Sequence, residues 1–138
     1  MAQALLSKYG GENFEVLSAG INAGKLNPMA IEVISEDEGI NISSYTTNNI
    51  LDYFKDGLHF HYVITVCDEA KKEPCPIFPS LDGILHWNIT SSAGDGTYEE
   101  KKAKVRNSKN ELKENILQFI ELVKNEHIKV GFPESWLV

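Results

Sequence analysis

Two stretches in the first third of the chain carry hydrophobic residues at the three- and four-residue spacing of an amphipathic helix. The first spans residues 1–9, and Gly10-Gly11 after it supplies the left-handed residue that commonly ends a helix. The second begins at Asn27-Pro28, where asparagine is a good N-cap and proline suits the first helical position, and it ends at Gly39. A short third helix is predicted over residues 43–54.

Other stretches indicate strands and one long helix. Residues 14–19 form a short β-rich run, and residues 62–67 form a continuous β-branched run without polar alternation. Such a continuous run is typical of a strand that is buried on both faces of a parallel sheet. Residues 84–89 are a third strand candidate, and the capping box at Thr97–Glu100 begins an amphipathic helix that continues to Val123.

Strands that alternate with helices predict an α/β domain whose parallel sheet is covered by helices. Three strands can be counted, and the chain opens on a helix where a fold of this kind opens on a strand. We therefore expect one strand to be absent from the front of the chain. The length of 138 residues is enough for one domain with a real core and too short for two comfortable ones.

The composition narrows the class of protein. Apolar residues make up 42% of the chain and charged residues 24%, as in soluble globular proteins. The formal net charge of -7 argues against a nucleic-acid surface, because phosphate binding needs clustered basic residues. No membrane-spanning run or signal peptide is recognisable, so we expect a cytoplasmic protein. In that reducing compartment a structural disulfide between its two cysteines, Cys67 and Cys75, is not expected.

Three segments carry a resemblance to a known family, namely LLSKYGGENFEVLSAG, NPMAIEVISEDEGINIS and YVITVCDEAKKEPCPIFP, the last followed by LHW. In this order and spacing the chain resembles the thioredoxin-coupled arsenate reductases, which have the low-molecular-weight tyrosine phosphatase fold. The resemblance runs from Met1 to about Lys124 and implies a single three-layer domain over residues 1–126. Residues 127–138 are left as an unassigned tail, whose alternating residues 128–132 could fill the place of the missing strand.

The resemblance also implies what the chain lacks. In the family an interior first strand ends in a Cys-Xaa5-Arg loop, which binds the oxyanion and supplies the nucleophile. The helix after that loop matches residues 1–10, no cysteine precedes Cys67, and the single arginine is Arg106 in the last helix. We therefore expect the strand and the loop to be missing and this chain to be inactive. A start assigned at an internal methionine would explain both missing parts.

A second departure concerns the general acid. The family usually places an aspartate a few residues after the position of Trp87, to protonate the leaving oxygen. Thr90 and Ser91 stand at the expected place in this chain. Asp95 is the alternative acid if the loop folds back, and an aspartate between glycines is otherwise a turn residue.

By position, Cys67 resembles the second redox cysteine of the family and Cys75 the third. In the family reaction the second cysteine attacks the adduct between the loop cysteine and arsenic, which releases arsenite. The third then takes over the disulfide and presents it to thioredoxin. Without the resemblance, Cys67 is interpreted as a small core residue at a strand end. A zinc site formed by the two cysteines with His59 and His61 is a further alternative, but the spacing of its cysteines is unusual for zinc ligands.

Ser18 ends the β-rich run, and the resemblance implies that it contacts the missing loop or a monovalent cation. The alternative is a hydroxyl that caps a turn. Three functions stay open for the chain: arsenate reduction, a non-enzymatic dithiol remnant or partner-dependent protein, and low-molecular-weight protein tyrosine phosphatase activity. Thioredoxin is the expected partner, with neither nucleic acid nor membrane, and exposed strand edges would favour a homodimer.

Overall fold

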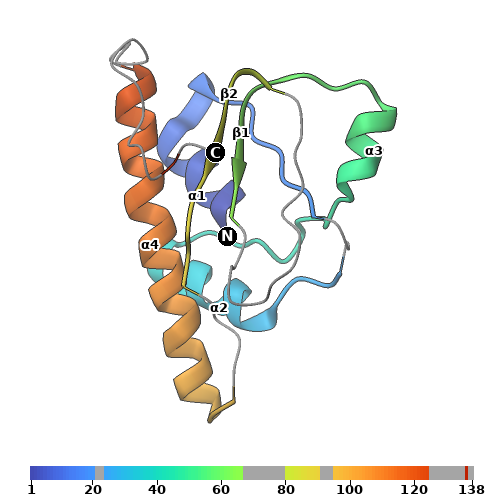
Figure 1. Ribbon diagram of the computed structural model, residues 1–138. Helices are drawn as coiled ribbons and strands as arrows, with labels where there is room; N and C mark the ends of the chain where they lie inside the picture. The colour runs from blue at the N-terminus through green and yellow to red at the C-terminus, as the bar shows by residue number, and fades with distance from the viewer. Residues whose placement is uncertain (21–23, 67–79, 91–94, 125–135, 137–138) are drawn as a thin grey trace.

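The computed structural model describes residues 1–20, 24–66, 80–90, 95–124 and 136 (Figure 1). Four α-helices and two β-strands lie in these parts of the chain, together with one turn of 3-10 helix at Gly11–Asn13. In order they are α1 (Ala2–Gly10), α2 (Pro28–Glu38), α3 (Ile50–Lys55), β1 (Phe60–Thr65), β2 (Ser80–His86) and α4 (Tyr98–Lys124). Helix α4 runs the length of the molecule and packs against α1 and α2.

The helix ends follow the local sequence signals. The Asn27 side chain accepts a hydrogen bond from the backbone N–H of Met29 at 3.0 Å, and α2 ends at Gly39 with φ at 68° in the left-handed region. At the start of α4 the Glu100 N–H donates to the Thr97 hydroxyl, and the Thr97 N–H donates to the Glu100 carboxylate. These predicted caps are confirmed, and so are the helices that they begin or end.

The two described strands pair in parallel, as predicted. The register sets Val63 against Ile84 and Thr65 against His86. The prediction that the first of these strands is buried on both faces is wrong, because every residue of β1 is half-buried or exposed. Tyr62 and Ile64 of β1 pack against the core. The short helix α3 lies across from α4 in Figure 1 and has no buried residue, so it covers the strands only loosely.

Two further predictions about secondary structure need correction. Residues 14–19 form no strand, because the segment has no ladder partner among the described residues and only Gly20 makes an isolated parallel bridge to Asn49. The structure therefore describes two strands where three were counted. The third helix was predicted to start at residue 43, but it starts at Ile50. Asn49 is its N-cap and accepts a hydrogen bond from the Leu51 N–H at 2.9 Å.

The core lies where α1, α2 and α4 meet the strands. Phe119 of α4 is at its centre, with ring centroids 5.9 Å from Phe14, 5.4 Å from Tyr62 and 6.3 Å from Trp87. Trp136, from the tail that the sequence left unassigned, is also a core residue with 5% of its surface exposed. The predicted strand at 128–132 lies outside the described residues. Among the helices that the structure describes, none is both long and apolar enough to cross a membrane.

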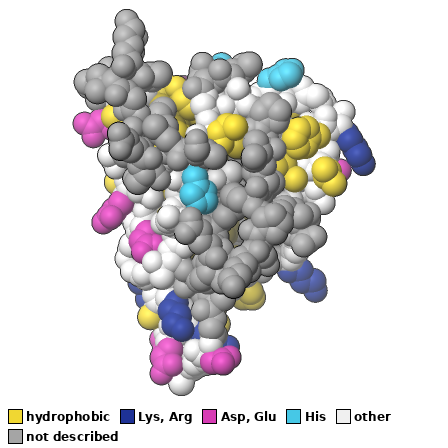
Figure 2. All heavy atoms as spheres, viewed as in Figure 1, with side chains coloured by type: hydrophobic (Ala, Val, Ile, Leu, Met, Phe, Trp, Pro, Cys, Tyr) yellow, Lys and Arg dark blue, Asp and Glu magenta, His cyan; other side chains and the backbone are white. Residues whose placement is uncertain are grey.

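Ion pairs join α2 to α4 on the surface. Lys102 and Arg106 of α4 pair with the exposed Glu36 at 2.7 and 2.8 Å, and Arg106 also pairs with Asp37 at 3.1 Å. Figure 2 shows charged side chains of both signs gathered at the end of the molecule where α4 begins. The only arginine of the chain therefore serves the contact between two helices.

Candidate functional site

Ser18 lies in a cluster of hydrogen bonds that joins three segments. Its hydroxyl donates to Gln3 Oε1 of α1 at 2.6 Å. Its carbonyl accepts from Asn48 Nδ2 at 3.1 Å and from the hydroxyl of Tyr53 in α3 at 3.0 Å. Burial raises the pKa of Tyr53 further above neutrality, where a tyrosine is a hydrogen-bond donor in any case. The Ser18 side chain thus ties α1 to the segment before α2, which is more than the capping of a local turn.

The cluster offers only neutral oxygens to a cation. The hydrogen-bond partners of Ser18 are an amide oxygen, an amide nitrogen and a phenol, with no carboxylate among them. Across the described part of the chain, no group of three or more His, Cys, Asp or Glu residues could hold a metal ion. The contact of Ser18 with a monovalent cation stays a prediction. Gln3 and Asn48 were not identified from the sequence, because an amide carries no pattern that marks its partner.

A second group of polar side chains lies at the carboxyl ends of β1 and β2. Thr65 Oγ1 is 2.7 Å from His86 Nδ1, and the other ring nitrogen of His86 is 3.2 Å from Asn88 Oδ1. The backbone N–H of Trp87 donates to the Thr65 carbonyl at 2.8 Å, which continues the ladder past the end of β2. Because the strands are parallel, both side chains come to the same edge of the sheet. In open α/β sheets this is the edge at which sites form.

The predicted redox cysteines follow this edge in the sequence. Cys67 comes two residues after Thr65, and Cys75 eight residues after Cys67, but both lie outside the described residues. His59 and His61 are exposed, and they lie just before and within the first part of β1, away from the edge that leads to Cys67. His59 and His61 are therefore surface residues, and His86 is the last residue of β2.

The loop after Trp87 is anchored to α4 at Thr90. The Thr90 N–H and hydroxyl donate to the two carboxylate oxygens of Glu111 at 2.8 and 2.7 Å, and the Ser108 hydroxyl donates to the Thr90 carbonyl at 2.7 Å. Thr90 is therefore a fixed point of the loop. Ser91 lies outside the described residues, and Asp95 is exposed just before α4. Glu111 was missed by sequence reasoning, since it is one of several glutamates on a helix with no local signal.

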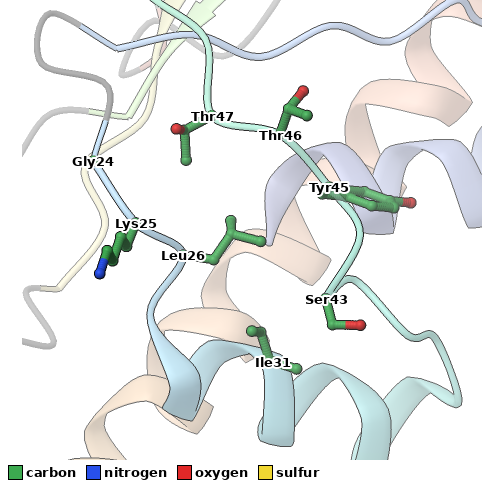
Figure 3. A pocket seen from close by; sticks show the side chains of 8 residues that line it. All are labelled: Gly24, Lys25, Leu26, Ile31, Ser43, Tyr45, Thr46 and Thr47. Carbon is green, nitrogen blue, oxygen red and sulfur yellow. The ribbon is translucent and has the colours of Figure 1, made fainter.

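A cavity of about 490 Å³ lies between residues 24–26, Ile31 of α2 and residues 43–47 (Figure 3). A site for a small ligand combines apolar walls with a few polar groups that converge on the ligand. In Figure 3 the polar ends of Lys25, Tyr45 and Thr46 point in different directions and do not converge. The geometry therefore does not assign a ligand to this cavity.

The parallel strand pair and the helices that share a core with it define an α/β protein, with polar side chains at the carboxyl edge of the strands. No model of a known protein family matches the chain. Comparison with curated proteins identifies relatives that cover most of the chain. The chain is 38% identical over 123 residues to an arsenate reductase of Bacillus licheniformis, an alignment that covers 88% of this chain and 85% of that protein.

Two further relatives agree with this match. An arsenate reductase of Halalkalibacterium halodurans is 35% identical, and one of Bacillus subtilis is 33% identical, each over 122 residues. Both alignments again cover 88% of this chain and 85% of the relative. The chain therefore belongs to the arsenate reductase family, and the resemblance that the sequence segments indicated is confirmed.

Proposed function

We propose that this chain takes part in the reduction of arsenate to arsenite, with Cys67 and Cys75 as the second and third cysteines of a disulfide cascade. The observation that carries the proposal is the alignment with arsenate reductases over 88% of the chain. The structure adds that Cys67 follows the carboxyl end of a strand in a parallel pair. Segments that leave such an edge are common places for reactive groups, because the strands hold them beside each other.

The fold that we propose is the three-layer type of the low-molecular-weight phosphatases. Supporting it, β1 and β2 lie between α4 and α3 in Figure 1, and the Tyr53 ring of α3 is 6.0 Å from the Phe60 ring of β1. A crystal structure with helices on one face only would contradict it.

The chemistry asked of the cysteine pair is thiol–disulfide exchange. The Cys67 thiolate attacks the sulfur of a cysteine–arsenic adduct, so that a sulfur–sulfur bond forms, the sulfur–arsenic bond breaks, and arsenic(V) leaves as arsenic(III). The Cys75 thiolate then attacks the sulfur of Cys67 and releases the first cysteine as a thiolate. A dithiol protein of the thioredoxin type reduces the Cys67–Cys75 disulfide and closes the cycle. The two electrons that arsenic gains are those that the sulfur atoms lose.

A second function is favoured by the residue inventory. Cys67 and Cys75 are the only cysteines of the 138 residues, and Arg106 is the only arginine. The Arg106 guanidinium is held by Glu36 and Asp37, so these residues do not form a cysteine–arginine loop for an oxyanion. We propose that residues 1–138 alone undergo dithiol exchange without arsenate turnover, the first thiol having to come from elsewhere.

One set of assays separates these functions. Purified residues 1–138 are incubated with arsenate, thioredoxin and thioredoxin reductase, and arsenite is measured. The expected result is no arsenite, while mild oxidation yields a Cys67–Cys75 disulfide that thioredoxin reduces. Arsenite production that Cys67→Ser abolishes would show the complete family reaction in this chain.

Two further outcomes are decisive. Failure of Cys67 and Cys75 to form a disulfide that thioredoxin reduces would refute the redox assignment. Hydrolysis of an aryl phosphate that persists in Cys67→Ser and Cys75→Ser would point to a phosphatase, because phosphate-ester hydrolysis has no use for the pair. The double variant Cys67→Ser/Cys75→Ser is the control for background oxidation.

A further inference from the structure

His86 stands between the end of β1 and the loop that follows β2. Its Nδ1 is 2.7 Å from the Thr65 hydroxyl, and its Nε2 is 3.2 Å from Asn88 Oδ1. Thr65 is the last residue of β1, and Cys67 follows it by two residues in the sequence. The ring therefore binds the last residue of β1 before the cysteine-bearing segment.

The two contacts of the ring decide which nitrogen carries the proton. The side-chain oxygen of Asn88 only accepts hydrogen bonds, so the Nε2–H of His86 donates to it. In the neutral imidazole the other nitrogen, Nδ1, is then an acceptor, and it accepts from the Thr65 hydroxyl. One directed chain of hydrogen bonds therefore runs from Thr65 through His86 to Asn88.

The Thr65 hydroxyl has a second acceptor nearby, the Leu85 carbonyl at 3.3 Å. The shorter distance to His86 Nδ1 makes the ring the stronger partner. Without the ring the hydroxyl can turn to Leu85, while the Thr65 carbonyl keeps its bond from the Trp87 N–H at 2.8 Å. Loss of the ring would thus leave the strand pair in place and change the direction in which the Thr65 side chain is held.

The other end of this chain of bonds leads to α4. Asn88 precedes Thr90 by two residues, and Thr90 is bound to Glu111 of α4 through its N–H and its hydroxyl. His86 therefore connects the end of β1 to a loop that is itself anchored to a helix.

From this geometry we propose that His86 is a positioning residue for thiol–disulfide exchange. By holding Thr65 against β2, it fixes the point from which the chain continues to Cys67. A fixed point of departure raises the effective concentration of one thiol at the other, because fewer arrangements of the chain compete with the reactive one. The inference rests on the proposed redox function of Cys67 and Cys75, and in it His86 acts through Thr65.

Closure of the disulfide by oxidised glutathione measures this effect. One thiolate of the pair attacks glutathione disulfide, so that a mixed disulfide forms and one glutathione thiolate leaves. The second thiolate of the chain then attacks the first cysteine sulfur, closes the Cys67–Cys75 bond and releases the other glutathione thiolate. The rate of this intramolecular step is followed by acid quench and mass spectrometry, after circular dichroism has shown that each variant is folded.

Asparagine and glutamine separate the two nitrogens of the ring. An asparagine amide places an acceptor near the position of Nδ1, and a glutamine amide places a donor near that of Nε2. His86→Asn should therefore keep the wild-type rate, whereas His86→Gln should slow closure about threefold to tenfold, the factor that corresponds to one net hydrogen bond. Equal rates for the two variants would overturn the proposal.

Thr65→Val removes the same bond from its other side and keeps the shape of the side chain, so it decides the question if His86→Gln does not fold. It should slow closure as much as His86→Gln, and the double variant should be no slower than either single variant. Additive slowing would show that His86 does not act through Thr65 and would overturn the proposal. His61→Gln is the matched control, because His61 is exposed on β1, and it should leave the rate unchanged.

Failure of the redox function and failure of the positioning role give different results. If the wild-type chain forms no Cys67–Cys75 disulfide, the redox function fails and the role of His86 in it fails too. If wild type, His86→Gln and Thr65→Val all close the disulfide at one rate, the redox function stands and only the role of His86 is overturned.

Discussion

Glu38 closes α2 with a buried carboxylate that several donors surround. Its side chain is 1% exposed. One carboxylate oxygen, Oε2, accepts from the Tyr9 hydroxyl at 2.5 Å and from Lys8 Nζ at 3.1 Å. The other, Oε1, has no well-aligned hydrogen bond among the described residues, but Lys113 Nζ lies 3.1 Å from it and Lys109 Nζ 3.6 Å. The helices α1, α2 and α4 therefore meet at one negative charge.

This environment decides the charge state of Glu38. Burial by itself raises the pKa of the carboxyl, but the Tyr9 hydroxyl and the ammonium groups of Lys113 and Lys8 outweigh it and lower the pKa from 4.5 to about 2. A shift of that size corresponds to about 3 kcal/mol of folding free energy. Since the folded pKa is below the unfolded value, the contribution is complete above about pH 5 and is lost as the pH falls towards 2.

We predict that Glu38→Gln lowers the free energy of unfolding by about 3 kcal/mol at pH 7, because it leaves the three lysines without their common counter-charge. The loss should shrink as the pH falls below 5, where wild-type Glu38 itself becomes protonated on unfolding. Urea unfolding followed by far-ultraviolet circular dichroism at several pH values between 7 and 3 gives the difference between the two proteins. Titration of the carboxyls that share no lysine with Glu38 cancels in that difference, whereas Asp37 shares Lys109 with it.

Glu36→Gln is the matched control. Its carboxylate also pairs with two basic residues of α4, but its side chain is 50% exposed, so its loss should cost at most about 1 kcal/mol. Equal losses for Glu38→Gln and Glu36→Gln at pH 7 would refute the argument from burial. A difference between wild type and Glu38→Gln that stays constant down to pH 3 would refute the pKa argument.

Two pairs of neighbouring or matched substitutions test the core and a helix end by the same unfolding measurement. Ile116→Ala should lower the free energy of unfolding by about 2–5 kcal/mol, because Ile116 is 1% exposed in the core. Its neighbour Leu117 is 42% exposed, so Leu117→Ala should change that free energy by less than about 0.5 kcal/mol. Similar losses for the two variants would contradict the placing of Ile116 in the core. Gly39→Ala should cost about 1 kcal/mol from its left-handed φ of 68° alone, since a Cβ there meets nothing within 4 Å, while Gly24→Ala has equal space and no such φ and should be neutral. A neutral Gly39→Ala would show that the end of α2 relaxes.

Helices were more predictable from the sequence than strands. Asn27, Gly39 and Thr97 act within one turn of their own position, so the chain around each residue is enough to fix the helix end. A strand is fixed by its partner, which lies far along the chain. Residues 14–19 have the composition of a strand, but no ladder partner for them is described, and β1 is covered less than its apolar sequence suggested.

The same distinction applies to the site. Cys67, Cys75 and Ser18 could be selected from the sequence because a resemblance marks their positions, although only Ser18 falls among the described residues. Its partners Gln3 and Asn48 were not predictable, because they are brought to it by the packing of α1 and of the segment before α3. Family position identifies which residue types matter, and tertiary contacts decide what each of them touches.

Thr90 shows why the tertiary contacts of a residue are needed to judge its role. It stands where the family usually has its general acid, and its hydroxyl is a donor already committed to Glu111. The N–H of the same residue binds the second oxygen of that carboxylate, and Ser108 holds its carbonyl, so every polar group of Thr90 faces α4. A residue fixed in this way positions the loop and cannot also deliver a proton to a leaving oxygen. If this chain takes part in a reaction that needs an acid, Asp95, exposed just before α4, is the carboxyl-bearing residue that the structure describes in that loop.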